Sequence, residues 1–297
     1  MKAQLKFFLL LFLFPLSVFA QSGIVVLQTD FGVKDSAVSE IKGVMYSVDK
    51  SLVVADLTQQ IPPFNIWEAA YRLLQAESYW PKGSVFVSVV DPGVGTSRKS
   101  VVALSKDGRY FVTPDNGTLT FIAENVGITE VREIDQSKNR LQGSGASYTF
   151  FGRDVYGYTA AKLASGKISF EQVGPVLNSP LVMFKYQAAE IKNHQLSGTV
   201  IVLDPNFGNV WTNISQKLAQ EWGMIVGKSY YVVIYKGKEK KFEETLPLQN
   251  TFGAVKKGAP LLYFNSLLNL SIALDQGNFA QQHHIQSGPD WRIVVKA

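Results

Sequence analysis

Short apolar runs alternate with amphipathic stretches of helical spacing in the first third of the chain. The expected strands cover residues 23–30, 51–58 and 84–91, and the expected helices cover residues 35–48 and 65–80. A chain that alternates strand and helix in this order forms a parallel sheet with right-handed crossover connections. We therefore predict an α/β domain with a mainly parallel sheet over residues 23–185.

The second half of the chain has a different pattern. After a polar connection at residues 187–195, short strands are separated by turns rich in Gly, Asn and Lys. The expected strands cover residues 196–204, 229–235, 241–248 and 292–297, with one helix over 269–282. These patterns predict a second, mostly antiparallel β domain over residues 192–297.

The first twenty residues have the composition of a signal peptide. Lys2 and Lys6 precede an apolar run that is too short to span a bilayer and that ends in Val18-Phe19-Ala20, a small-x-small cleavage site. A buried core helix is the alternative. We expect cleavage after residue 20, a periplasmic or secreted protein, and no stable membrane insertion afterwards. The chain has no cysteine, so neither a disulfide nor a lipid thioether can form.

Charge and histidine content limit the possible partners. The net charge of +5 is spread along 297 residues without a basic block, which argues against nucleic-acid binding. The histidines His194, His283 and His284 lie outside every motif, and adjacent residues rarely converge on one ion, so we predict no metal site.

Aspartates follow or end the three strands expected in the N-terminal domain. Asp30, Asp56 and Asp91 are these residues. Ligands of parallel α/β sheets collect beyond the carboxyl ends of the strands. This edge of the sheet is therefore the expected ligand site.

Five longer motifs identify a family. They are TDFGVKD (29–35), VDPGVGTSRK (90–99), TPDNGTLT (113–120), TFFGRDVY (149–156) and LDPNFGNVWTNI (203–214). With them the chain resembles the S-adenosyl-L-methionine (SAM) hydroxide adenosyltransferase, or SAM hydrolase, family, which is related to the fluorinase and the chlorinase. The resemblance extends over nearly all of the chain after residue 20.

The resemblance implies a three-layer α/β domain, a C-terminal antiparallel β-barrel-like domain, and a homotrimer with active sites between subunits. It also implies substitution at the ribose C5′ of SAM, by water in the hydrolases and by halide in the halogenases. SAM would be the substrate, and no cofactor is expected.

Several site residues of the N-terminal domain are implied by the same resemblance. Asp30 would hold the ribose hydroxyls, which suit its two acceptor oxygens, or it would cap the following turn. Asp35 would contact the methionine end of SAM, or it would cap the next helix. Phe64 and Phe252, the latter in the second domain, would line the ribose and stack on adenine, and Phe150 would be a further substrate-binding residue. Any of these rings could equally belong to a core.

The second domain would supply the remaining contacts. Asp204 would bind the substrate ammonium and Asn209 the adenine edge, although both also suit a structural turn. Ser266 would contact the methionine carboxylate. The glycine and glutamate usual in this stretch are replaced by Leu268 and Ser271.

Asp91 and Arg98 match the catalytic pair of the hydrolases beside the nucleophilic water. The halogenases have tyrosine at the aspartate position, so Asp91 argues against halide chemistry. A neutral thioether leaves, so the pair must orient and deprotonate water without a general acid. We expect the arginine to depress the pKa of the aspartate. A salt bridge that only braces the turn is the alternative.

One departure affects the catalytic set. The histidine that completes it in the hydrolases is Phe151 here, and Gln59 replaces another frequent histidine. We therefore consider three functions: a slow SAM hydrolase, a protein that binds or converts another adenosyl or nucleoside ligand, and a structural trimer with a relic pocket. Turnover of SAM and ligand-induced melting shifts distinguish them.

Overall fold

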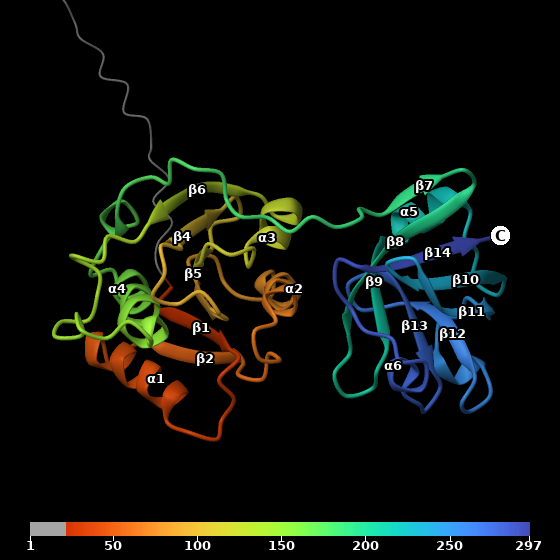
Figure 1. Ribbon diagram of the computed structural model, residues 1–297, viewed down its shortest axis with the longest axis horizontal. Coiled ribbons are helices and arrows are strands. Elements are labelled where there is room, and N and C mark those ends of the chain that lie inside the picture. The colour runs from red at the N-terminus through yellow and green to blue at the C-terminus, as the bar shows by residue number, and fades with distance from the viewer. Residues whose placement is uncertain (1–21) are drawn as a thin grey trace, which may run out of the picture.

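The computed structural model describes residues 22–297. The expected signal peptide, residues 1–20, lies outside the described residues. Figure 1 shows an α/β domain and a β domain side by side, joined by an extended segment. Within residues 22–297, no helix is both long and apolar enough to cross a membrane.

The first domain is built on a six-stranded sheet of order β2-β1-β3-β5-β4-β6. Its strands are β1 (Ile24–Thr29), β2 (Val53–Thr58), β3 (Val85–Val89), β4 (Ser100–Ser105), β5 (Tyr110–Pro114) and β6 (Ile128–Glu133). Strands β2, β1, β3 and β5 run parallel, and β4 is antiparallel to both of its neighbours. The mainly parallel sheet predicted from the sequence is confirmed.

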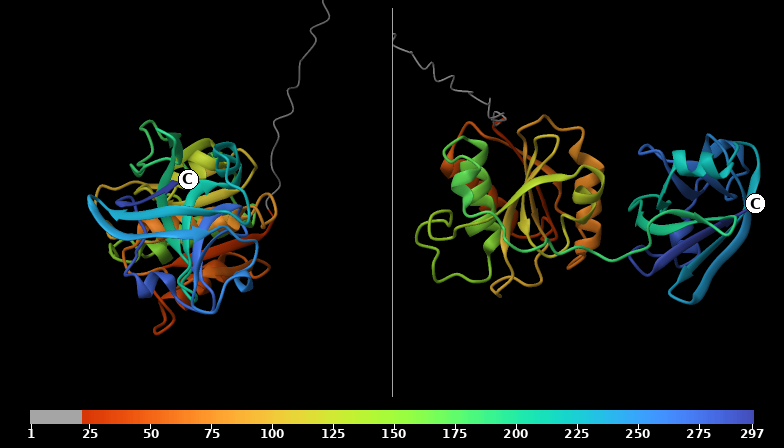
Figure 2. Two further views of the ribbon diagram at one scale, coloured as in Figure 1. Left: turned by 90° about the vertical axis from the view of Figure 1, so that its right-hand side faces the viewer. Right: turned by 90° about the horizontal axis from the view of Figure 1, so that it is seen from above.

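Helices cover both faces of this sheet, which gives three layers (Figure 2). One face carries α1 (Ala37–Val48), the π-helix η1 (Gly152–Gly157) and α4 (Tyr158–Ala164), and the other carries α2 (Ile66–Glu77) and α3 (Thr120–Asn125). The apolar residues that alternate along β1 enter these two cores in turn: Val25 and Leu27 face α1, and Val26 faces α2. A short 3₁₀ turn, η2 (Glu171–Val173), follows α4.

The second domain is an antiparallel sheet of eight strands that curls into a nearly closed barrel. Its elements are β7 (Glu190–Lys192), β8 (Gln195–Leu203), β9 (Val210–Ser215), α5 (Gln216–Trp222), β10 (Ser229–Lys236), β11 (Glu239–Pro247), η3 (Phe252–Ala254), β12 (Pro260–Phe264), β13 (Asn269–Leu274), α6 (Phe279–Gln282) and β14 (Trp291–Lys296). The main order is β11-β10-β14-β8-β9-β13-β12. A bridge between Leu248 and Leu262 brings the ends of this order together. The expected barrel-like domain is confirmed.

The helix predicted over residues 269–282 is wrong in its first half. Residues 269–274 form β13, and only Phe279–Gln282 are helical. Leu270 and Ile272 face the main barrel core, whereas Ala273 faces a separate small cluster, which is the period of a strand. Pairing with strands on both sides decided the structure of this ambiguous apolar run. Similarly, the polar connection at residues 187–195 contains the short strand β7.

Aromatic side chains connect the two domains. Trp67 of α2 donates a hydrogen bond from Nε1 to the carbonyl of Ile201 in β8 at 2.6 Å. Its ring packs edge-on against Phe121 and Phe184, and Tyr71 packs in the same way against Trp211 of β9. The segment between the domains is also tied to the first domain, since Thr120 Oγ1 accepts a hydrogen bond from the backbone of Phe184 at 3.0 Å.

Candidate active site

The first of two candidate half-sites lies at the carboxyl ends of β1 and β3. A cavity of about 230 Å³ opens there, lined by Asp30, Phe31, Pro63, Phe64, Val89, Asp91, Val94, Thr149, Phe150, Phe151 and Gly152. Four residues expected in the site, Asp30, Phe64, Asp91 and Phe150, therefore line one cavity. Residues 30–31 and 89–94 meet here because the ends of the parallel strands β1 and β3 share one edge of the sheet, and residues 63–64 and 149–152 complete the lining.

Asp30 follows β1 and braces the turn opposite. Its Oδ2 accepts a hydrogen bond from the backbone N–H of Phe64 at 2.9 Å. Phe64 has a left-handed backbone (φ 67°), and 72% of it is exposed. Such a conformation is unusual for a bulky residue, and the aspartate contact helps to hold it. Asp30 therefore stabilises the turn while its side chain also lines the cavity.

Asp91 and Arg98 form a buried ion pair. Arg98 Nη2 lies 2.5 Å from Asp91 Oδ2, and the two side chains are only 10% and 5% exposed. Arg98 also donates from Nη1 to the carbonyl of Lys99 at 2.7 Å. The other carboxylate oxygen of the aspartate, Oδ1, is buried without a hydrogen-bond partner among the described residues. The pair thus braces the turn, as the alternative interpretation holds, and leaves one buried acceptor oxygen unpaired in a residue that lines the cavity.

A third side chain, Tyr156, contacts this pair, and the sequence did not indicate it. The hydroxyl of Tyr156 lies 3.2 Å from Asp91 Oδ2 and 3.1 Å from Ser100 Oγ. Tyr156 is fully buried and belongs to the TFFGRDVY motif. Its position five residues after the motif's aromatic pair gave no signal, because the contact depends on a tertiary approach to the loop at residue 91.

Burial controls the charge on Asp91. Removal from water raises the pKa of Asp91 above its ordinary value, and the charge of Arg98 and the hydrogen bond from Tyr156 offset this only in part. The expectation that the arginine would depress this pKa is therefore wrong in its net result. Sequence shows the neighbouring charge but not the desolvation, which is the larger effect here. A carboxylate with a raised pKa is a stronger base toward water.

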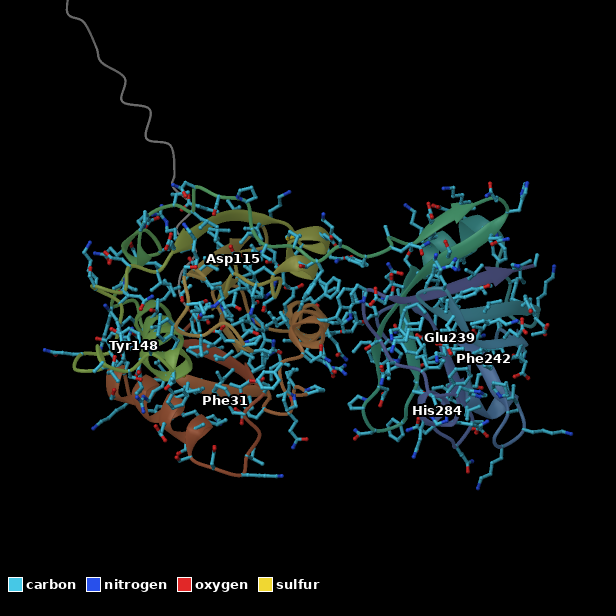
Figure 3. All side chains as sticks on the ribbon, viewed as in Figure 1. Phe31, Asp115, Tyr148, Glu239, Phe242 and His284 are labelled. Atoms are coloured by element: carbon cyan, nitrogen blue, oxygen red, sulfur yellow. The ribbon has the colours of Figure 1, made fainter. Side chains whose placement is uncertain are left out.

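Phe151 stands where the resemblance to the hydrolases implies a histidine, and its ring is capped by an arginine. The ring centroid lies 5.0 Å from the guanidinium carbon of Arg140, and the residue is only 6% exposed. The neighbouring Phe150 packs edge-on against Phe31, which Figure 3 labels, and lies 4.8 Å below the guanidinium of Arg153. This wall of the cavity is aromatic and contains no proton acceptor at residue 151.

Two aspartates considered from the sequence lie elsewhere. Asp35 is exposed and accepts a hydrogen bond from the backbone N–H of Ala37 at 3.0 Å, so it supports the start of α1 and does not line the cavity. Asp56 lies within β2 and pairs with Lys42 of α1 at 2.8 Å. Gln59 is buried and donates to Asp56 at 2.8 Å. These residues stabilise the first domain rather than the cavity.

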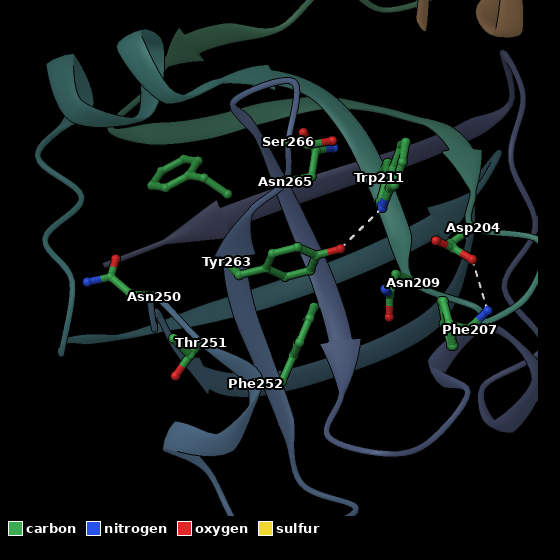
Figure 4. A pocket seen from close by; sticks show the side chains of 11 residues that line it. Asp204, Phe207, Asn209, Trp211, Asn250, Thr251, Phe252, Tyr263, Asn265 and Ser266 are labelled. Atoms are coloured by element: carbon green, nitrogen blue, oxygen red, sulfur yellow. Dashed lines mark hydrogen bonds between the residues drawn. The ribbon is translucent and has the colours of Figure 1, made fainter. Parts of the chain in front are cut away.

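The second half-site is a cavity of about 390 Å³ on the barrel (Figure 4). It is lined by Asp204, Phe207, Asn209, Trp211, Asn250, Thr251, Phe252, Tyr263, Phe264, Asn265 and Ser266. The four residues expected from the second domain, Asp204, Asn209, Phe252 and Ser266, are thus brought together. Asp204 Oδ1 accepts hydrogen bonds from the backbone of Asn206 and Phe207, which is also the turn role considered for it.

Aromatic residues form the floor of this second cavity. Tyr263 accepts a hydrogen bond from Trp211 Nε1 at 3.1 Å, and its ring packs edge-on against Phe252 at a centroid distance of 4.9 Å. Phe252 is 42% exposed and Phe207 is 66% exposed, so neither is a core residue. Exposed flat rings beside buried polar groups suit the face and the edge of a purine.

The stretch around Ser266 contains Leu268 and Ser271, the two residues that differ from the family pattern, and Asn265. Leu268 is exposed with a left-handed backbone (φ 58°), and Ser271 is buried and donates to the carbonyl of Asn269. Asn265, which sequence reasoning missed, accepts from the backbone of Leu267 and Asn269 and leaves its Nδ2 buried without a partner among residues 22–297. The signal for it was its place directly before Ser266 at the end of a strand.

The two cavities share no lining residue. Each lies on its own domain of the chain. Among the described residues, no cluster of three or more His, Cys, Asp or Glu side chains could hold a metal ion.

The fold and the two half-sites define a two-domain protein whose α/β sheet carries an acid–arginine pair and whose β barrel carries an aromatic, polar pocket. Family models for the N-terminal and C-terminal domains of SAM hydroxide adenosyltransferases match residues 25–174 and 198–292. The chain belongs to the SAM hydroxide adenosyltransferase family.

Individual relatives agree with this assignment. A (R)-S-adenosyl-L-methionine hydrolase of Thermus thermophilus is 30% identical over 90% of this chain and 97% of its own length. A fluorinase of Actinopolyspora mzabensis is 28% identical over 91% of this chain and 97% of its own length. The crystal structure of an uncharacterized conserved protein from Thermotoga maritima superimposes with a TM-score of 0.83, at 33% identity, over 92% of this chain and all of that one.

Proposed function

We propose that this protein hydrolyses SAM to adenosine and L-methionine. The observation that carries the proposal is the buried pair of Asp91 and Arg98, with Asp91 Oδ1 unpaired and with Asp30 and Asp91 lining one cavity. The named hydrolase relative and the family models support the same reaction. An aspartate at position 91 favours water over halide as the nucleophile, because a second anion beside a carboxylate is repelled.

The chemistry needs only an oriented water and a proton acceptor. The water oxygen bonds to the ribose C5′ while the C5′–S bond breaks. The electron pair of the C5′–S bond stays on sulfur, which becomes the neutral thioether of methionine. Asp91 takes the proton that the attacking water loses, which leaves the 5′ hydroxyl of adenosine. Because a sulfonium is a good leaving group, neither a general acid nor a cofactor is required.

We assign ligand contacts by chemical type. Asp30 would bind the ribose diol between Phe64 and Phe150. On the barrel, Asn209 and Phe252 would bind adenine by its edge and face. Asp204 would pair with the ammonium and Ser266 with the carboxylate of the methionine portion. Asp35 lies at the N-terminal end of α1 outside the cavity, so it would act on the ligand only through another residue.

We also propose that the complete site forms between subunits of a homotrimer, outside the cytoplasm after removal of residues 1–20. Two observations support the assembly. The two half-sites are separate cavities on one chain, and each is lined in part by exposed rings, Phe64 at the first and Phe207 and Phe252 at the second. An apolar rim of this kind is typical of surfaces that another copy covers.

The reaction is tested by incubating the protein, residues 21–297, with SAM in water labelled with oxygen-18. We expect adenosine carrying the label at its 5′ hydroxyl, together with methionine. Label in no product, or adenosine formation equal to that in buffer, would contradict the proposal.

Subunit complementation tests the assembly. Asp91→Asn impairs the half-site on the sheet, and Asn209→Ala impairs the half-site on the barrel. If each site combines halves from two copies, co-expressed variants form some sites with both halves intact, and we expect about a quarter to a third of normal turnover, by the closed symmetry of a trimer. Each variant alone should show almost none. A mixture that stays as inactive as its components would place each site within one chain.

A second function is favoured by Phe151. A cavity without the histidine could bind an adenosyl or nucleoside ligand with little or no catalysis. Stabilisation of the fold by adenosine or methylthioadenosine without any SAM turnover would favour this function over hydrolysis.

A further inference from the structure

We propose that Tyr156 is a positioning residue of this site: its hydroxyl, together with Arg98, holds one oxygen of Asp91 and leaves the other unpaired, so that the unpaired oxygen can accept a hydrogen bond from the nucleophilic water. The inference rests on the proposed function and adds a residue to it. Tyr156 of the π-helix makes a polar contact with Asp91, which the phenylalanine ring at residue 151 cannot make.

The hydrogen-bond pattern carries the inference. Tyr156 Oη at 3.2 Å and Arg98 Nη2 at 2.5 Å both approach Asp91 Oδ2, while Asp91 Oδ1 has no partner within residues 22–297. An ionised carboxylate only accepts, so the tyrosine must donate its single proton to it. Ser100 Oγ, 3.1 Å from the same hydroxyl, must then be the donor in the second contact. The result is a directed chain from Ser100 through Tyr156 to Asp91.

The π-helix and its two glycines place Tyr156 close to Asp91. Residues Gly152–Gly157 form a π-helix, a rare conformation that is frequent at functional sites. A Cβ on Gly157 would lie 3.0 Å from Ile41 Cγ2 and from the carbonyl oxygen of Gly152, and a Cβ on Gly152 would lie 3.0 Å from Val89 Cγ1. The two glycines therefore allow η1 to pack closely against α1 and β3, which brings Tyr156 under the loop at Asp91.

Packing alone does not explain a tyrosine at this position. The residue is fully buried in a cluster that includes Val89, Val102 and Val155. Phenylalanine would fill nearly the same volume without burying a hydroxyl, which costs free energy unless it is hydrogen-bonded. The partners of this hydroxyl are Asp91 and Ser100, so the polar group serves the loop that carries the catalytic aspartate.

The contact also affects the titration of the site. The charged and titratable groups facing Asp91 are Arg98 from its own loop and Tyr156 from η1, and Asp115 faces the same arginine. The hydrogen bond from Tyr156 lowers the pKa of Asp91, in opposition to burial. Without it this pKa rises. Because the reaction needs the ionised carboxylate, activity should then be lost at a higher pH on the acid side.

The test is Tyr156→Phe, with turnover of SAM measured from pH 4 to 9. We expect kcat to fall about tenfold at neutral pH, as for losing one hydrogen bond to a charged group, with KM changed less than about twofold. The acid limb of the kcat profile should move to higher pH. Tyr110→Phe is the matched control, since Tyr110 is buried in the same core but has no contact with Asp91, and its profile should not move.

Ser100→Ala provides a second variant that keeps the tyrosine, and it should shift the acid limb in the same direction by a smaller amount. An acid limb that is unchanged in both variants would overturn the inference, whatever happens to thermal stability. Absence of turnover in the unsubstituted protein would instead overturn the proposed function. The carboxyl-carbon NMR titration of Asp91, assigned with Asp91→Asn, then decides this inference alone: a higher midpoint in Tyr156→Phe supports it, and an equal midpoint overturns it.

Discussion

Asp91→Asn should lower SAM turnover by about a thousandfold, because the proposed proton acceptor is lost while the shape of the side chain is kept. The amide oxygen can still accept from Arg98 and Tyr156, so both buried donors keep a partner. Adenosine should therefore stabilise this variant about as much as it stabilises the unsubstituted protein. The measurements are kcat by adenosine chromatography and the melting shift with adenosine.

Stability should respond little to this substitution, for a reason that follows from the sign of the pKa shift. Burial raises the pKa of folded Asp91, so the contribution of this carboxyl group to stability is complete below its ordinary value of 3.8 and is lost as pH rises through the folded pKa. A neutral amide avoids this loss at neutral pH. Asp56→Asn is the matched control, since Asp56 pairs with Lys42 on the surface, and its turnover should be normal. An Asp91→Asn protein that keeps half of its activity would contradict the assigned role.

Phe151→His should raise SAM turnover by about ten- to a hundredfold, the usual range for a positioned acid–base group. The substituted ring would line the same cavity as Asp91 and would lie beneath the guanidinium of Arg140. A nearby positive charge disfavours the imidazolium, so the histidine would stay neutral and able to accept a proton at pH 7. Single-turnover kinetics, which separate chemistry from product release, provide the measurement.

Phe151→Leu is the control for this second prediction, because it removes the ring without adding a polar group. It should not raise turnover. If Phe151→His folds, binds adenosine and still hydrolyses SAM no faster than the unsubstituted protein, then the aromatic residue is not what limits the reaction.

For the first domain, the sequence predicted the positions of the strands and the location of the cavity better than it predicted the side-chain contacts. Periodicity located β1 and β3, and the rule that ligands collect beyond parallel strands placed Asp30 and Asp91 in one cavity. Asp56 failed the same rule because β2 continues to Thr58, so this aspartate lies within the strand and faces α1.

Other features depended on information that local sequence does not hold. The run at residues 269–282 has apolar spacing compatible with both helix and strand, and only pairing with β9 and β12 decides it. The contact of Tyr156 with Asp91 joins residues that lie 65 positions apart in the chain. The net pKa of Asp91 depends on desolvation, which requires the packed structure.

The aromatic connection at Trp67 has a consequence for how a ligand is held. With the indole bonded to β8 and the connecting segment tied to Thr120, hydrogen bonds and aromatic packing join the two domains. Closing one domain onto the other around a ligand would have to break these contacts. If neighbouring copies complete the site, as we propose, the ligand would enter and leave when these copies separate, and its residence time would depend on how often they do.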